Sequence, residues 1–224
     1  MKIGIIFTVL TPQLLEDTIG SVKAAVGEDA EIITFDDASV LEEIKAAGRI
    51  TAPPAARYVE MCMKAAEQNV DAILCACSSV GDVADAMQDI ARLIGIPIVR
   101  IDEEMCREAV RLGKRVAILA TQPTTLAPTR STVQRAAREM GREVETIDCY
   151  MEGAFGLDPE QFLKRLSDET GKVAGKADVI LLAQGSMAYA QETLRNKYNM
   201  PVLASPRFGA ESLRRALVAK GVMK

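Results

Sequence analysis

One segment of the chain repeats another, and this repeat limits the possible folds more than any other feature. Residues 70–80 read VDAILCACSSV and residues 177–187 read ADVILLAQGSM, so five of the eleven aligned positions are identical. Two further pairs follow in the same order, namely residues 2–11 with 115–124 and residues 97–99 with 201–203. Short apolar segments resemble one another by chance, but an ordered series of matches is harder to obtain in that way. We therefore interpret the chain as an internal duplication.

Segments typical of buried strands alternate with amphipathic helical patterns along the whole chain. The expected strands are residues 2–8, 31–35, 71–77, 97–101, 115–121, 143–148, 178–184 and 201–204. The expected helices are residues 13–26, 41–47, 54–68, 81–93, 103–112, 129–140, 159–175, 188–196 and 209–220. This alternation indicates an α/β fold with parallel sheets covered on both faces.

Together, the repeat and the alternation predict two pseudo-symmetric, flavodoxin-like α/β halves, each built on a parallel sheet. We expect residues 1–100 plus 207–224 to form the first half and residues 101–206 to form the second. Open parallel sheets bind ligands beyond the carboxyl ends of their strands. The active site is therefore expected in the cleft between the halves, where Cys77 of one copy faces Gln184 of the other.

Composition excludes several classes of function. The net charge of −4 and the pI near 5.1 argue against a protein that binds nucleic acid or an anionic membrane. No segment approaches the roughly 18 apolar residues that a transmembrane helix needs, and the N-terminus lacks the pattern of a signal peptide. The five cysteines are odd in number and widely spaced, unlike a disulfide framework. We expect a cytoplasmic protein.

The chain has no histidine, which removes the commonest general base, the commonest metal ligand and every Ser-His or Cys-His nucleophile. Proton transfer must then use thiol, carboxylate, lysine, tyrosine or water. Cys75 and Cys77 lack further spaced Cys or His residues, so no metal site is expected. Neither a Gly-x-Gly-x-x-Gly turn nor a Walker loop is present, and no lysine is placed to hold pyridoxal phosphate, so no cofactor is expected.

Polar residues follow the strand ends of both copies. Cys77 is the candidate catalytic residue, because a thiol before a helix start can be partly exposed and receive N–H donors. A strand cysteine is more often a packed apolar residue, and we expect that role for Cys75, which lies deeper. Small hydroxyl residues at strand ends can hold a carboxylate, although many simply cap helices. The candidate substrate-binding residues are Thr8, Ser78, Ser79, Thr121, Thr124, Thr125, Gln184, Gly185 and Ser186.

Three segments together resemble the aspartate/glutamate/hydantoin racemase superfamily, and the resemblance spans essentially the whole chain. They read ACSSVG at residues 76–81, ILATQPTT at 118–125 and LAQGSMA at 182–188. The resemblance implies a cofactor-independent isomerase that acts on a small amino acid or related carboxylate and forms a homo-oligomer. In this family two thiols act on opposite faces of an acidic carbon, one removing a proton and the other returning one. By resemblance, Cys77 corresponds to the first thiol, and the threonines at 121, 124 and 125 to carboxylate-holding residues.

Gln184 departs from the family pattern, because the second catalytic thiol belongs at its position. An amide is neither an acid nor a base near pH 7, so the two-thiol mechanism does not carry over to this chain. Three enzymatic interpretations remain: a racemase or epimerase whose second proton donor is another group or water, a one-thiol enzyme like arylmalonate decarboxylase, and a cis–trans isomerase like maleate isomerase. The non-enzymatic alternative is a protein that only binds a small carboxylate. We expect Gln184 to orient the substrate.

Overall fold

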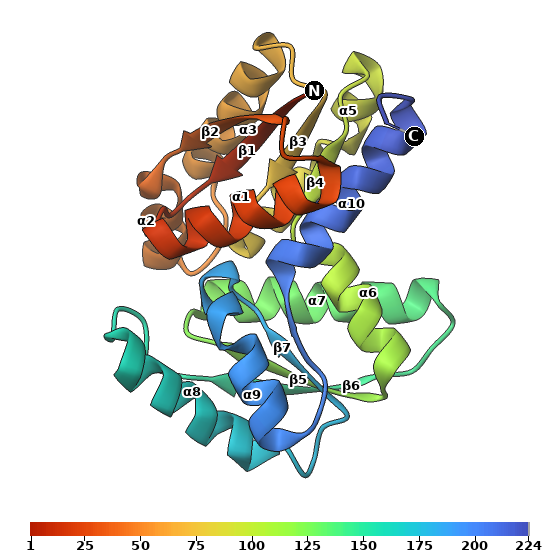
Figure 1. The fold of residues 1–224 in the computed structure, drawn as a ribbon. Coiled ribbons are helices and arrows are strands. Elements are labelled where there is room, and N and C mark those ends of the chain that lie inside the picture. Colours follow the sequence, from red (N-terminus) through yellow and green to blue (C-terminus); the bar gives the residue numbers. More distant parts are fainter. Residues whose placement is uncertain (224) are drawn as a thin grey trace. The chain divides into compact units, whose positions relative to one another are not determined.

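The computed structural model describes residues 1–223 and contains two parallel four-stranded sheets (Figure 1). The chain divides into two units, the first comprising Met1–Ile101 and the segment from Pro206 onward, and the second comprising Asp102–Ser205. Each unit holds one sheet with helices packed around it. The predicted α/β fold with two parallel-sheet halves is therefore confirmed.

The first unit has strand order β2-β1-β3-β4, with every pair of neighbours parallel. Its strands are β1 (Lys2–Phe7), β2 (Glu31–Asp36), β3 (Ala72–Cys75) and β4 (Ile98–Arg100). Its helices are α1 (Pro12–Val26), α2 (Ala38–Ala47), α3 (Ala52–Glu67), the 3-10 helix η1 (Ser78–Val80), α4 (Gly81–Ala86), α5 (Gln88–Ile94) and α10 (Ser205–Lys220).

Both faces of this first sheet are covered by helices. On one face, Ile5 of β1 packs in a cluster with Leu14 of α1 and Leu213 of α10. On the other face, Ile73 of β3 packs in a cluster with Tyr58 of α3. Strands buried on both faces carry continuous apolar runs, which is why they can be recognised in the sequence.

The second unit has strand order β6-β5-β7-β8, again with parallel neighbours. Its strands are β5 (Arg115–Ala120), β6 (Glu145–Tyr150), β7 (Val179–Leu182) and β8 (Val202–Ala204). Its helices are α6 (Glu103–Leu112), α7 (Pro123–Glu139), α8 (Pro159–Val173), the 3-10 helix η2 (Gly185–Ala190) and α9 (Gln191–Tyr198). Leu182 of β7 clusters with Leu166 of α8 and Leu194 of α9, while α6 and α7 contact β7 and β5 respectively.

Two helix predictions were wrong in ways that affect the strand ends. Helix α7 begins at Pro123, not at 129, because Pro123 suits the first helical position and Pro128 is accommodated inside the helix. The threonines at 124 and 125 therefore belong to the first turn of a helix. The single helix predicted over 81–93 is instead interrupted at Met87, between α4 and α5, after the short turn of η1.

The two units repeat the same local geometry at their central strands. Ile6 of β1 pairs with Cys75 of β3, and Leu119 of β5 pairs with Leu182 of β7. Each pair marks the last paired position between its two strands. The same strand order and the same register thus underlie the sequence repeat.

An aspartate holds the amino end of the first strand in each unit. Asp71 accepts a hydrogen bond from the backbone N–H of Lys2 at 2.8 Å. Asp178, its counterpart in the repeat, accepts from the backbone N–H groups of Lys114 and Arg115, both at 2.9 Å. The Arg115 guanidinium also donates to Asp178 at 2.6 Å. The occurrence of aspartate at this position in both copies of the repeat therefore has a structural reason, because each aspartate accepts hydrogen bonds from backbone N–H groups at the strand end.

The carboxyl group of Asp178 should stay ionised to a lower pH than that of an ordinary aspartate. The hydrogen bonds from the Arg115 side chain and backbone lower the pKa of Asp178 to about 2. Because the folded-state pKa lies below the unfolded value of about 3.9, its contribution to stability is present above pH 4 and is lost as the pH falls towards 2. A carboxyl-carbon NMR titration measures this pKa directly. Arg115→Gln should move it back towards 3.9, and an unchanged pKa in that variant would contradict the assignment to Arg115.

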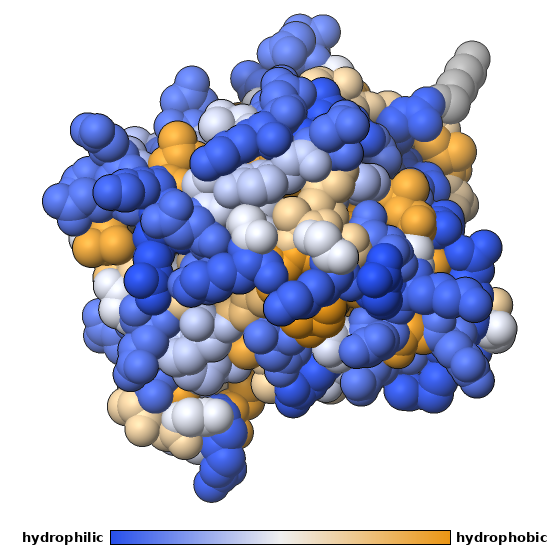
Figure 2. Space-filling view, turned by 90° about the horizontal axis from the view of Figure 1, so that it is seen from below, coloured by the Kyte–Doolittle hydropathy of each residue, from blue (hydrophilic) through white to orange (hydrophobic). Residues whose placement is uncertain are grey.

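Among residues 1–223, the helices are too short or too polar to cross a membrane. The face drawn in Figure 2 is covered mainly by hydrophilic residues, and the hydrophobic ones form small separate groups. Isolated exposed apolar residues of this kind are ordinary on folded proteins.

Candidate active site

In the first unit, Cys77 lies two residues beyond the end of β3. The strand ends at Cys75, so the prediction that Cys77 is the last strand residue was wrong, although its backbone remains extended (φ −143°, ψ 117°). Cys75 is 1% exposed, whereas Cys77 is half-buried and packs against the edge of the apolar cluster that contains Cys75. Cys75 is therefore the deeper of the two thiols, as the sequence predicts.

Hydroxyl groups accompany Cys77 at this end of the sheet. Thr8 follows the last residue of β1, and Cys77 follows the end of β3, so the two residues lie beyond the ends of neighbouring parallel strands. Thr8 is 1% exposed, and its Oγ1 has no hydrogen-bond partner among the residues described. Ser78 and Ser79 are also buried and form the turn of η1 directly after Cys77. A buried hydroxyl without a partner is costly, which makes Thr8 a candidate ligand contact.

A buried tyrosine, Tyr58, lies close to Cys77 and to two further thiols, those of Cys62 and Cys75. Burial and the neighbouring Cys75, Cys62 and Cys77 raise the pKa of the Tyr58 phenol well above its usual range. Hydrogen bonding with Cys75, together with burial, raises the pKa of the Cys62 thiol far above its usual range. The Tyr58 phenol and the Cys62 thiol therefore stay protonated at neutral pH, and they place no negative charge near Cys77.

In the second unit, Gln184 occupies the position equivalent to Cys77. It lies two residues beyond β7, with an extended backbone (φ −119°, ψ 133°) directly before η2. Its side-chain oxygen accepts from the backbone N–H of Thr121 at 2.7 Å and from the Thr121 hydroxyl at 3.0 Å. This oxygen is occupied, so only the amide NH₂ of Gln184 is left to donate to a ligand.

The remaining candidates of the second unit surround this pair. Thr124 and Thr125 are 8% and 4% exposed in the first turn of α7, and the Oγ1 of Thr124 has no hydrogen-bond partner within the described chain. Gly185 and Ser186 are half-buried in the first turn of η2. The structure therefore gathers Thr121, Thr124, Thr125 and Gln184 with these two residues at one end of the second sheet. The start of a long helix also directs N–H groups towards this end.

The other cysteines show no sign of a metal or redox centre. The five cysteines form no disulfide bonds, and no group of three His, Cys, Asp or Glu residues suited to a metal ion occurs in residues 1–223. Cys149 is half-buried like Cys77, but burial raises its pKa to about 11, so it remains a thiol at neutral pH. Cys149 therefore offers a matched comparison for the reactivity of Cys77.

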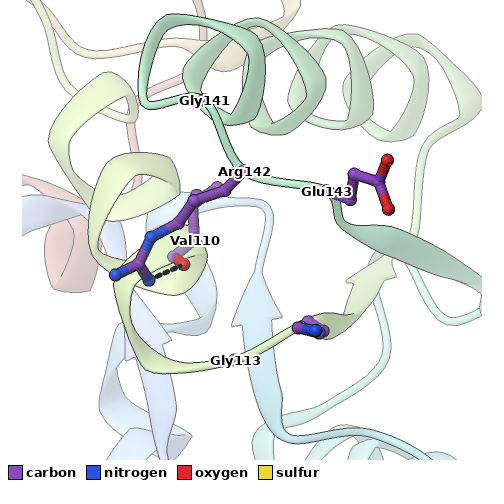
Figure 3. Close-up of a pocket in the computed structure, with 6 residues that line it drawn as sticks. Val110, Gly113, Gly141, Arg142 and Glu143 are labelled. Atoms are coloured by element: carbon purple, nitrogen blue, oxygen red, sulfur yellow. Dashed lines mark hydrogen bonds between the residues drawn. The ribbon is translucent and has the colours of Figure 1, made fainter.

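A hollow of about 500 Å³ lies at the opposite, amino end of the second sheet (Figure 3). The residues lining it are Val110, Gly113, Lys114, Gly141, Arg142 and Glu143. Arg142 donates to the carbonyl oxygens of Val110 at 2.9 Å and Arg111 at 3.0 Å, which caps the end of α6. Figure 3 shows Glu143 directed away from Arg142. None of the predicted site residues lines this hollow, and the Arg142 side chain caps α6.

Comparison with protein families identifies the scaffold. Residues 9–213 match the Asp/Glu/Hydantoin racemase family. The chain belongs to this family. The match includes Cys77, Thr121 and Gln184, and it confirms the resemblance drawn from the three sequence segments. A comparison with curated protein sequences finds no match.

Solved structures with a similar fold include several racemases. Allantoin racemase from Klebsiella pneumoniae aligns with a TM-score of 0.69 and 17% identity, covering 99% of this chain and 89% of that one. Glutamate racemase from Francisella tularensis, in complex with D-glutamate, aligns with a TM-score of 0.68 and 15% identity, covering 100% and 83%. An arylmalonate decarboxylase aligns with a TM-score of 0.61 and 16% identity, covering 96% and 92%. At these identities the likeness establishes the racemase-family fold.

Sequence reasoning missed two residues of the first unit, Tyr58 and Arg100. Tyr58 is fully buried, and its hydroxyl lies close to the Cys75 thiol. Arg100 is 3% exposed at the end of β4. A signal for Arg100 was available, because it is the one charged residue within the otherwise apolar run of residues 96–101.

Proposed function

We propose that this member of the racemase family is a cofactor-independent isomerase of the racemase or epimerase type. Its substrate is a small amino acid or related carboxylate, and Cys77 is its acid–base residue. The observation that carries the proposal is the place of Cys77, a half-buried thiol beyond the end of a parallel strand, with the buried, unpartnered hydroxyl of Thr8 beyond the end of the neighbouring strand. A group that must meet a substrate needs this combination of access and nearby polar atoms.

The proposed step is a proton transfer at the carbon next to the carboxylate. The Cys77 thiolate takes the proton, so the C–H bond breaks, an S–H bond forms, and the electron pair of the carbon moves into the carboxylate group. Hydroxyl and N–H donors stabilise the negative charge that develops on the carboxylate oxygens. Return of a proton to the opposite face of the carbon completes an isomerisation, with no net oxidation or reduction.

Gln184 bears on which group returns that proton. The side-chain oxygen of Gln184 accepts two hydrogen bonds from Thr121. Its NH₂ group can donate a hydrogen bond to a ligand but is neither a general acid nor a general base near pH 7. We therefore assign Gln184 to substrate orientation and the second proton to water or another group.

The position of Gln184 also supports a second candidate function. With one thiol and one fixed amide, the same residues suit an enzyme that protonates a single face, as in decarboxylation, or one that adds Cys77 to a double bond. A protein that only binds a small carboxylate would use the same hydroxyls without the thiol.

Proton NMR in deuterium oxide with a panel of small amino and hydroxy acids separates these functions. The protein is first dialysed against a chelator, and no pyridoxal phosphate is added. Deuterium entering the α-position with loss of optical purity supports the racemase. Exchange with retained configuration would contradict racemisation and favour single-face chemistry. Binding by calorimetry without exchange of any acid would favour the binding protein.

The proposal extends to the setting of the enzyme. We propose a cytoplasmic homo-oligomer whose only ligand is a small carboxylate, with no nucleic-acid or membrane partner. The negative net charge argues against a nucleic-acid or membrane partner. Cysteines without disulfide bonds are typical of the reducing cytoplasm. Light scattering, with and without the substrate, measures the oligomeric state.

A further inference from the structure

Arg100 is a buried cation close to the segment that carries Cys77. It ends β4 and pairs in register with Cys75 of β3. Its side chain is only 2% exposed. A buried guanidinium requires charged or polar partners, so the identity of those partners indicates what the residue does.

Two acidic partners of Arg100 lie on α4, the helix that follows Cys77 and η1. The Arg100 Nη1 atom lies 2.6 Å from the carboxylate of Asp85 and 3.7 Å from that of Asp82. The arginine therefore ties α4 to the edge strand of the sheet. It also compensates two negative charges that follow Cys77 by five and eight residues.

The guanidinium also lies against the first residue of α4. A Cβ atom added at Gly81 would lie 2.2 Å from the Arg100 Nη2 atom and 2.3 Å from its Cζ atom. The backbone of Gly81 is ordinary right-handed helix (φ −55°), so the glycine is required by space and not by conformation. Any side chain at position 81 would displace the arginine.

We propose that Arg100 is a positioning residue for Cys77. The segment from Cys77 to Gly81 is short: β3 ends two residues before it, and at its other end the Arg100 guanidinium lies against Gly81 and pairs with Asp85 further along α4. Its middle is the single turn of η1, in which the Val80 N–H donates to the Cys77 carbonyl at 3.4 Å. Arg100 therefore holds the thiol in place and keeps the carboxylates of α4 compensated. This inference rests on the proposed role of Cys77 as the reacting thiol.

The reactivity of the thiol itself provides a test that needs no substrate. Alkylation of Cys77 by iodoacetamide is followed across pH in the whole protein, with mass spectrometry of the Cys77 peptide. Arg100→Gln removes the positive charge beside the carboxylates of Asp82 and Asp85, and the more negative surroundings disfavour the thiolate. We expect the apparent pKa of Cys77 to rise by about one unit, so that alkylation at pH 7 slows about tenfold. Arg100→Lys should restore most of this loss, because it keeps the charge.

Two controls separate positioning from general destabilisation. Arg92→Gln removes an exposed arginine paired with Asp89 on the adjacent α5, and it should leave the Cys77 profile unchanged. Within every sample, Cys149 is an internal reference whose slow alkylation should not change. The neighbouring Tyr58 and Cys75 are kept in all variants. A folded Arg100→Gln protein with the wild-type Cys77 profile would overturn the proposal.

Gly81→Ala keeps the test decisive if Arg100→Gln does not fold. The added methyl group must displace the guanidinium, so Cys77 alkylation at pH 7 should slow several-fold although the charge is retained. An unchanged profile in folded Gly81→Ala would overturn the proposal as well. The function is tested separately: if Cys77→Ala still exchanged α-protons while the Arg100 variants altered alkylation, the proposed function would fail and the positioning role would stand.

Discussion

Replacement of Cys77 by alanine should abolish exchange of the substrate α-proton. A positioned acid–base group contributes about 10² to 10⁴ in rate, and the chain has no histidine that could replace it. Cys77 is half-buried at a strand end, so the smaller side chain should leave the fold intact. The measurement is the rate of deuterium entry at the α-carbon by NMR, with the thermal unfolding midpoint as a check on folding.

Two cysteine variants serve as controls for this loss. Cys149→Ala removes the other half-buried thiol, and we expect it to exchange at the wild-type rate, because burial keeps that thiol protonated. Cys75→Ala removes a buried thiol from β3, the strand that precedes Cys77. The change leaves a small cavity and should lower stability more than activity. Exchange by Cys77→Ala at more than a tenth of the wild-type rate would rule out Cys77 as the acid–base residue.

The α/β fold was predictable because its signals are local. Strands buried on both faces appear as short apolar runs, and the repeat supplied the equivalence of Cys77 and Gln184 without any structure. The register supports that equivalence, since each residue lies two positions beyond a matching strand pair. The start of α7 was missed because a proline inside a helix reads as a boundary, whereas the fold accommodates Pro128.

The contacts of the candidate site were not predictable in the same way. The hydrogen bonds from Thr121 to Gln184 join residues that are 63 positions apart, and they depend on the pairing of β5 with β7. The ion pair between Arg100 and Asp85 depends likewise on how α4 packs on β4. A sequence pattern identifies which side chains reach a strand end, but three-dimensional packing decides which of their atoms are already occupied.

The amide of Gln184, whose oxygen is already hydrogen-bonded to Thr121, cannot supply the second proton, and we expect Gln184→Cys to racemise its substrate faster than the wild type. The variant restores a thiol at the position where the family pattern has one, and a thiol can donate the second proton that the amide cannot. We expect the racemisation rate to rise about a hundredfold, towards the rate of α-proton exchange. Chiral chromatography gives the racemisation rate, and NMR in deuterium oxide gives the exchange rate on the same samples.

Gln184→Ser is the matched control, because it also removes the amide but supplies no acid or base near neutral pH. Both variants leave the backbone N–H of Thr121, a residue 3% exposed, without its acceptor, which should cost about 1–3 kcal/mol of stability in each. A difference in racemisation between them therefore reports the thiol and not the lost hydrogen bonds. Adding Cys77→Ala to Gln184→Cys should remove the gain, since a single thiol at position 184 cannot both take and return the proton. Equal racemisation by the cysteine and serine variants would mean that position 184 does not exchange protons with the substrate, and the second donor would then have to be sought elsewhere in the chain.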